Sequence, residues 1–181
     1  FLAKYKEKLK ADVMVLTDTQ NYDTGLPALT VSLRGLVSFE VEVRAHRTSM
    51  HSGMWGGPIA DPVQALCKML ASVTDTEGRV CVPGLWDEVR PLSSAEEKAL
   101  NELPFELLEF RSQAGLLPGT RFVPARDGTV KPLAQMWREP SFSINAIAAG
   151  NRKGAANIIN DSAWAKVGLR IVPDMDPDRT L

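Results

Sequence analysis

Residues 36–44 read Leu-Val-Ser-Phe-Glu-Val-Glu-Val-Arg, and this stretch decides the fold. Its apolar side chains at alternate positions from Val37 to Val43 share one face, and its polar side chains share the other. Strict alternation of this kind predicts a strand of an antiparallel sheet with one face in water and the other on a core. We therefore expect a helical layer on a single face of that sheet.

Helix and strand signals follow on both sides of this stretch. Asp61 and Pro62 form an N-cap with proline at the first helical position, and residues 62–73 carry an apolar stripe. Ser93 stands three residues before Glu96, which predicts a capping box and a second helical region. Further strands are expected at residues 11–16, 28–34, 142–149 and 165–172, and a short helix at residues 1–10.

This order of elements predicts an α/β (α+β) fold. We expect a ferredoxin-like two-layer sandwich, with an antiparallel sheet and helices on one face. Residues 80–135 approximately, rich in glycine and proline, are expected to form an inserted helical and irregular segment.

Composition excludes two classes of partner. The 181 residues carry 21 Lys and Arg against 22 Asp and Glu, so the net charge of −1 predicts no binding to nucleic acid. No apolar stretch approaches the roughly 20 residues that span a bilayer, so no membrane partner is expected. Cys67 and Cys81 lack metal-type spacing, and a reducing, cytoplasmic location is predicted.

A glycine-rich turn at residues 51–58 holds one of the two histidines, His51. A histidine held there by the backbone can act as a general acid or base, as an oxyanion donor or as a metal ligand. A surface-turn histidine without a chemical role fits the same pattern, and the pattern alone leaves these alternatives open.

Three other residues are candidates for a site. Asp18 follows an apolar run, where a carboxylate can contact a ligand or a metal, or simply form a turn. Arg170 interrupts an apolar strand, and its guanidinium needs a carboxylate from the protein or from a substrate. Asn157 follows small residues, and its amide can hold a carbonyl or belong to an ordinary polar loop.

Taken together, the motifs resemble one family, the co-catalytic di-zinc metallopeptidases that include carnosinase, aminoacylase, glutamate carboxypeptidase and succinyl-diaminopimelate desuccinylase. Their combined order is specific, and Trp137-Arg138-x-Pro140 favours the carnosinase-like dipeptidases. The motifs are Asp18, Gly-Leu-Pro-Ala-Leu-Thr at residues 25–30, Leu-Arg-Gly at 33–35, His-Ser-Gly-x-x-Gly-Gly at 51–57 and Leu-Arg-Ile-Val-Pro at 169–173.

The resemblance implies a domain organisation. Residues 1–25 would be the C-terminal edge of an upstream catalytic domain, with its helix, its strand and Asp18. Residues 26–181 would be a lid and dimerisation domain, with the insertion at about 80–135 and truncation at its second helix. The implied partners are a second copy of the chain, the catalytic domain of the same polypeptide, and a small peptide or acyl-amino-acid substrate.

The resemblance also implies roles for single residues. Asp18 would ligate zinc, and His51 would reach the active site of the partner subunit and steady the oxyanion. Asn157 would contact the substrate, and Arg170 would bind its C-terminal carboxylate. The expected cofactor of the parent enzyme is a pair of zinc ions, which lower the pKa of a bound water and polarise the scissile carbonyl.

Most metal ligands of the family are missing from this sequence. There is no His-x-Asp motif, no Glu-Glu pair and no final histidine ligand, and one aspartate cannot hold zinc by itself. The sequence therefore predicts a lid domain that is inactive alone, from a parent dipeptidase or amidohydrolase that cleaves a bond next to a free carboxylate. The alternatives are a stand-alone ferredoxin-like module that binds a small molecule, and a pure dimerisation scaffold.

Overall fold

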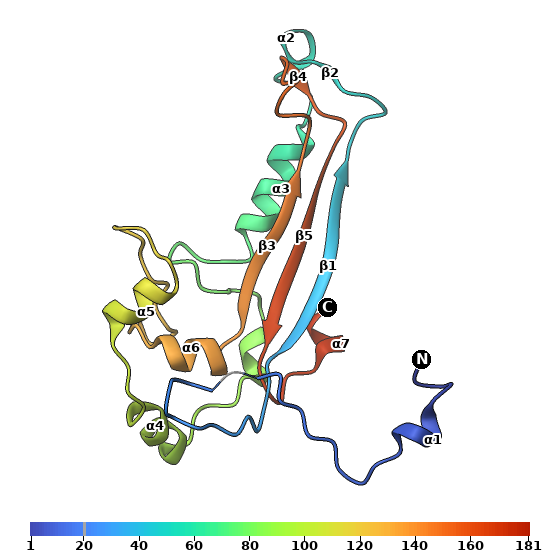
Figure 1. Cartoon of the computed structure of the whole chain (residues 1–181). Coiled ribbons are helices and arrows are strands. Elements are labelled where there is room, and N and C mark those ends of the chain that lie inside the picture. Colours follow the sequence, from blue (N-terminus) through green and yellow to red (C-terminus); the bar gives the residue numbers. More distant parts are fainter. Residues whose placement is uncertain (20) are drawn as a thin grey trace. The chain divides into compact units, whose positions relative to one another are not determined.

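The computed structural model describes residues 1–19 and 21–181, which divide into two compact units, Phe1–Ser32 and Leu33–Leu181 (Figure 1). Among its described residues, the first unit holds one short helix, α1 (Lys6–Leu9). The second holds the sheet and the remaining helices. None of the described helices is long and apolar enough to cross a membrane.

The predicted strands at residues 11–16 and 28–34 are absent. Both segments are irregular, and the side chains of Val15 and Val31 are 79% and 86% exposed. A strand is stable only when a neighbour satisfies its backbone and its apolar side chains are covered. Neither segment pairs into a sheet among the described residues, so the sequence prediction is wrong for this chain at both places.

The sheet has three antiparallel strands in the order β1-β5-β3. The strands are β1 (Gly35–Arg44), β3 (Ser141–Ala148) and β5 (Ser162–Ile171). The central strand β5 pairs on both sides and buries every second side chain, as the alternation of residues 165–172 predicts. A bulge between Ile144 and Ala146 shifts the register of β3 against β5.

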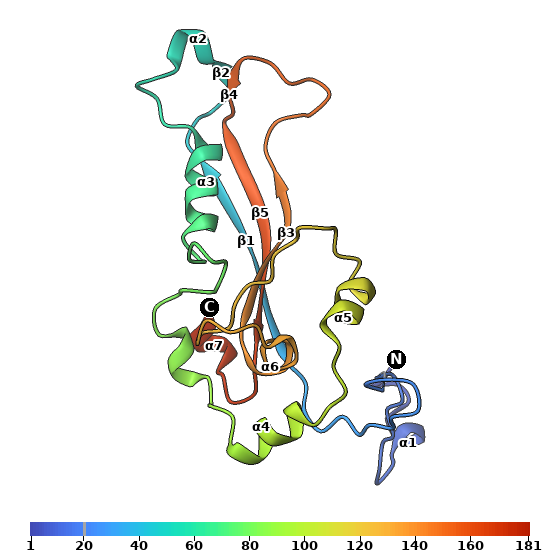
Figure 2. The same cartoon turned by 90° about the vertical axis from the view of Figure 1, so that its left-hand side faces the viewer.

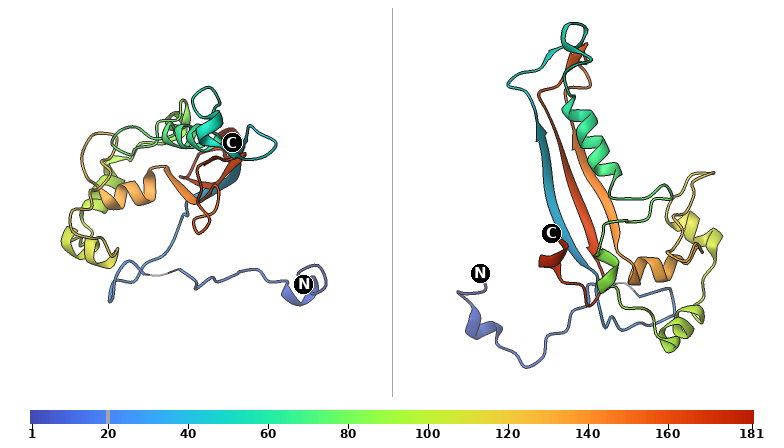
Figure 3. Two further views of the ribbon diagram at one scale, coloured as in Figure 1. Left: turned by 90° about the horizontal axis from the view of Figure 1, so that it is seen from above. Right: turned by 180° about the vertical axis from the view of Figure 1, so that it is seen from behind.

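One helix, α3 (Pro62–Ala71), lies along a single face of this sheet (Figure 2, Figure 3). Asp61 caps it by accepting a hydrogen bond from the Val63 N–H at 2.8 Å, and Pro62 occupies the first turn. The helix buries Leu66 completely and Leu70 almost completely against Ala165 and Val167 of β5. The predicted two-layer α/β arrangement, with an antiparallel sheet and helix on one face, is therefore confirmed.

The segment between α3 and β3 contains the insertion. Its 3-10 helix η1 contributes Leu85 to a second buried cluster, with Val37 of β1 and Ile171 of β5. The segment predicted at residues 80–135 approximately, with helical and irregular structure, ends inside a helix that starts at Pro132. The elements here are η1 (Leu85–Glu88), α4 (Ser94–Asn101), α5 (Leu107–Gln113) and α6 (Pro132–Arg138).

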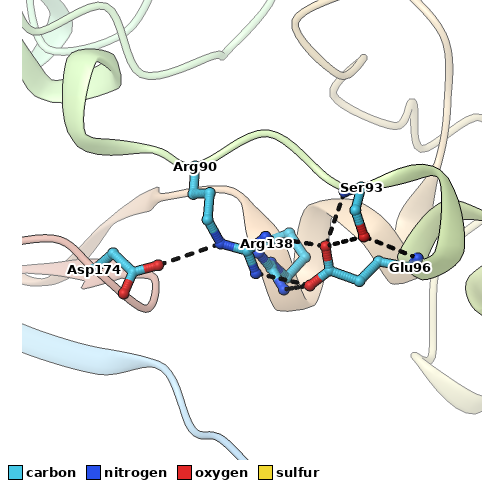
Figure 4. A network of polar contacts seen from close by, with 5 residues as sticks. All are labelled: Arg90, Ser93, Glu96, Arg138 and Asp174. Atoms are coloured by element: carbon cyan, nitrogen blue, oxygen red, sulfur yellow. Dashed lines mark hydrogen bonds and ion pairs between the residues drawn. The ribbon is translucent and has the colours of Figure 1, made fainter.

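An ion-pair network fastens the insertion to the end of the sheet (Figure 4). Glu96 accepts hydrogen bonds from Arg90 at 2.7 Å and from Arg138 at 2.9 Å, and Arg90 also contacts Asp174 at 3.3 Å. Ser93 completes the predicted capping box with Glu96. Since Arg138 ends α6 and Asp174 follows β5, the network joins three segments that are far apart in the sequence.

Two small strands and two short helices complete the chain. The strand β2 (Met50–His51) pairs with β4 (Ile158–Ile159), and α2 (Ser52–Trp55) follows β2 directly. These three elements lie together at one end of the long sheet, drawn at the top of Figure 1. The helix α7 (Pro177–Thr180) starts at an Asp176 cap, as the sequence predicts.

Candidate functional site

His51 is held by its own turn. Its Nδ1 accepts a hydrogen bond from the Gly53 N–H at 3.1 Å, so His51 caps α2. An Nδ1 that accepts carries no proton, so the neutral ring carries its proton on Nε2. The side chain is exposed, and Nε2 is therefore available as a hydrogen-bond donor to a group outside this turn.

Glycines shape the turn beside this histidine. A Cβ on Gly53 would lie 2.8 Å from Cε1 of His51, and Gly57 adopts a φ of +106°, which side chains disfavour. The glycines of the His-Ser-Gly-x-x-Gly-Gly motif thus let the turn close around the ring.

A carboxylate anchors the loop before His51 to the sheet. Asp161 accepts hydrogen bonds from the Ser49 hydroxyl and from the Arg44 guanidinium, both at 2.9 Å. These contacts, with the Ser49 hydrogen bond first, hold the pKa of the Asp161 carboxyl below its usual range. The sequence does not reveal this trio, because residues 44, 49 and 161 meet only through the fold.

The structure brings His51 and Asn157 together. His51 pairs with Ile158 in the two-stranded sheet, and the Ser52 N–H donates to the Asn157 carbonyl at 2.9 Å. The Asn157 side chain is exposed beside the histidine turn. The histidine turn and the segment at Asn157 are therefore neighbours in the fold.

Arg170 lies in a different place. It is near the end of β5, paired across the sheet with Leu36 on one side and Ser141 on the other, and its side chain is exposed. The buried residues of β5 face α3, so Arg170 belongs to the opposite, open face of the sheet. Eight residues of extended strand separate it from Ser162, a span of roughly 26 Å, and the histidine turn lies beyond Ser162 (Figure 1).

Asp18 lies in the first unit, where its side chain is exposed. In the described part of the chain, no three side chains of His, Cys, Asp or Glu come together in a way that could hold a metal ion. The role of Asp18 stays a prediction.

A hollow in the insertion has none of the four candidate residues in its lining. It has a volume of about 440 Å³ between α4 and α6, and its lining includes Leu100, Phe105 and Leu133. Its lining contains no histidine, cysteine or arginine, and its charged residues are Glu97 and Lys131.

Residues 31–181 match the M20 peptidase dimerisation domain. The chain belongs to this family. The resemblance to the carnosinase-containing metallopeptidases is therefore confirmed, and it argues against a stand-alone regulatory module.

Curated relatives include dipeptidases. The Beta-Ala-His dipeptidase of Rattus norvegicus is 31% identical over 167 residues, which cover 92% of this chain and 33% of the relative. The Cys-Gly metallodipeptidase DUG1 of Candida albicans is 29% identical over 168 residues, covering 92% of this chain and 34% of the relative. The chain thus spans about a third of the length of these relatives.

Solved structures agree with this assignment. Human carnosine dipeptidase 1 gives a TM-score of 0.70 at 30% identity, over 81% of this chain and 30% of that one. The dipeptidase Dug1p from Saccharomyces cerevisiae gives 0.72 at 28% identity, over 85% and 31%. The M20 metallo-carboxypeptidase Sso-CP2 from Sulfolobus solfataricus gives 0.78 over 99% and 46%, and its 24% identity supports the fold alone.

Proposed function

We propose that this chain is the dimerisation and substrate-binding lid of a zinc-dependent dipeptidase, which cleaves a peptide or amide bond next to a free carboxylate. The observation that carries the proposal is the division of the candidate residues between two ends of one sheet. His51 and Asn157 are together at one end, and Arg170 is at the other.

This separation favours sites shared between two subunits. A dipeptide is less than half as long as the roughly 26 Å of strand between Ser162 and Arg170. His51 and Arg170 of one chain therefore cannot contact the same small substrate. In a twofold dimer, His51 of one subunit can meet Arg170 of the other, and each of two equivalent sites then receives both groups.

The surface beside β3 suits a second copy of the chain. In the described part of the chain β3 has no strand on its outer side, so its backbone groups are free to pair there. Ile144 and Ile147 of β3 are 47% and 53% exposed, and Met69 of α3 is 49% exposed. Cys67, Ile144 and Ile147 also line a hollow of about 370 Å³ between α3 and β3. An apolar surface next to a free strand edge is typical of an interface.

The proposed roles follow from the side-chain chemistry. The His51 Nε2–H and the Asn157 amide would donate to the oxyanion that forms at the scissile carbonyl. The Arg170 guanidinium would bind the C-terminal carboxylate with two parallel hydrogen bonds. Zinc would supply an activated water and polarise the carbonyl. Its ligands besides Asp18 would come from the rest of the protein, so we expect the chain alone to be inactive. The cytoplasmic location of the protein stays a prediction.

The two histidines give a matched test in the full-length protein. We expect His51→Ala to lower kcat for a dipeptide by roughly 100- to 1,000-fold, as loss of one oxyanion donor does elsewhere. His46→Ala is the control, because the His46 ring contacts the Ala60 carbonyl at 2.9 Å and has no proposed contact with substrate.

Steady-state kinetics of both variants, with dimerisation measured by light scattering, decides between the candidate roles. Near-normal kcat in His46→Ala together with the loss in His51→Ala supports the proposal. An unchanged kcat in a dimeric His51→Ala enzyme would instead indicate a dimerisation scaffold whose histidine has no chemical role.

A further inference from the structure

A second arginine stands beside Arg170 on the open face of the sheet. Gly35 starts β1 opposite Ile171, and a Cβ on Gly35 would lie 2.7 Å from Cγ1 of that buried isoleucine. The Cβ position of Gly35 therefore faces the core. Successive residues of an extended chain point to opposite faces, so Arg34 and Leu36 belong to the open face.

The strand register brings Arg34 close to Arg170. Leu36 is the direct partner of Arg170. Arg34 directly precedes β1, two residues before Leu36, and so stands diagonal to Arg170 just outside the paired strand. Diagonal positions are roughly 7–8 Å apart, within reach of two long side chains that converge on one ligand. Partial burial and, more weakly, the positive charge of Arg170 lower the pKa of the Arg34 guanidinium, and the second of these causes agrees with this proximity.

Neither arginine is neutralised. Among the described residues, no carboxylate lies within ion-pair distance of Arg34 or of Arg170. The next charged groups along the open face are already paired, since Lys166 contacts Glu40 at 3.6 Å. Two like charges, one of them half-buried, are unfavourable together unless an anion joins them.

A hydroxyl completes the arrangement. Ser141 of β3 is the other direct partner of Arg170, so it lies on the same face. Two guanidinium groups and one hydroxyl group then surround a patch that carries two positive charges. One carboxylate compensates only one of these charges, and a ligand with two carboxylates compensates both.

We propose that Arg34 is a specificity-determining residue that selects substrates whose C-terminal residue carries a second carboxylate, such as dipeptides that end in glutamate or aspartate. This inference rests on the proposed function, in which Arg170 binds the C-terminal carboxylate. Arg34 then contacts the side-chain carboxylate of the same residue.

The test compares two substrates of nearly equal shape in the full-length enzyme, Ala-Glu and Ala-Gln. We expect the wild-type enzyme to prefer Ala-Glu by about tenfold in kcat/KM, the size of one charge-assisted hydrogen bond. Arg34→Gln should abolish this preference by raising KM for Ala-Glu, while kcat/KM for Ala-Gln stays nearly unchanged. Arg34→Lys should keep part of it, because the positive charge remains.

Two controls keep the result specific. Arg121→Gln removes an exposed arginine of the insertion, whose contact to Glu77 is 3.8 Å, and should leave the preference intact. Inhibition of the wild-type enzyme by glutarate and by butyrate needs no variant, and glutarate should bind about tenfold more tightly. This second measurement decides the matter if Arg34→Gln fails to fold.

Two results would contradict the proposed role of Arg34 while leaving the proposed function intact. One is equal activity of the wild-type enzyme on Ala-Glu and Ala-Gln. The other is an unchanged ratio of kcat/KM for the two dipeptides in a folded Arg34→Gln variant. Equal inhibition by glutarate and butyrate would do the same. Failure of the wild-type enzyme to hydrolyse either dipeptide, despite full metal loading, would contradict the proposed function as well.

Discussion

At the scale of single residues, Glu96 connects several segments of the insertion through its hydrogen bonds and ion pairs (Figure 4). It accepts from two guanidinium groups and from the cap residue Ser93, and these contacts hold the pKa of its carboxyl well below the ordinary 4.5, with the Arg90 hydrogen bond as the main cause. Because the pKa is depressed in the folded state, the network stabilises the fold fully above pH 4.5. This contribution is lost as the pH falls towards the folded-state pKa.

We therefore expect Glu96→Gln to weaken the acid dependence of stability. The wild-type chain should lose stability progressively below about pH 4.5, and the variant should lose less, since its amide does not titrate. Urea unfolding of both proteins at pH 7, 4.5 and 3 measures this effect. Parallel loss of stability in the two proteins over that range would show that other carboxyl groups dominate.

At the scale of elements, the packing of α3 on β5 is the centre of the two-layer fold. Leu66 is fully buried and contributes to the cluster with Ala163, Ala165 and Val167, whereas Gln64 of the same helix is exposed. The helix stays on the sheet because its apolar stripe fits the small side chains of the central strand. A change of side-chain volume at the buried position should thus affect the whole layer.

Leu66→Ala should reduce the free energy of unfolding by roughly 2–5 kcal/mol, because it removes apolar contacts and leaves a cavity. Gln64→Ala, on the solvent side, should change it by less than about 0.5 kcal/mol. Urea titration monitored by circular dichroism gives both values. A loss below about 1 kcal/mol in Leu66→Ala would mean that α3 is not held by this cluster.

The sequence predicted the elements whose signals are local. Strict alternation identified β1 and β5, and the Asp61 and Ser93 caps identified the starts of α3 and α4, because these patterns follow from backbone geometry. Residues 11–16 and 28–34 carry apolar runs like those of the observed strands, but they form no strands. The reason is that strand pairing depends on other parts of the chain. Pro132 resembled a breaker and is instead the first residue of α6.

The sequence indicated single residues of the candidate site, but it did not predict how they lie relative to one another. The glycine motif indicated His51, and its hydrogen bond to the Gly53 N–H agrees with a ring held by its own turn. The proximity of Arg34 to Arg170 depends on the register between β1 and β5, which a single sequence does not give. The contribution of Ser49 and Asp161 to the histidine loop depends on contacts across 112 residues for the same reason.

At the scale of the whole molecule, the sheet separates the groups that a peptidase site would need together. The histidine turn lies beyond one end of the three-stranded sheet and Arg170 lies near the other, with the length of β5 between them (Figure 1). A rigid strand cannot fold back to bring its ends together, so a shared site requires a second subunit. Dimerisation is thus a part of the proposed chemistry as well as of the assembly.

Subunit mixing tests this claim most directly. Full-length His51→Ala and Arg170→Ala proteins, each nearly inactive alone, are mixed in equal amounts, dissociated and reassociated. If His51 acts across the dimer, each mixed dimer has one intact site, and activity should recover to about a quarter of wild type. If mixed dimers form, as verified with two affinity tags, and activity stays at the level of the separate variants, His51 and Arg170 do not serve a shared site and the account is contradicted.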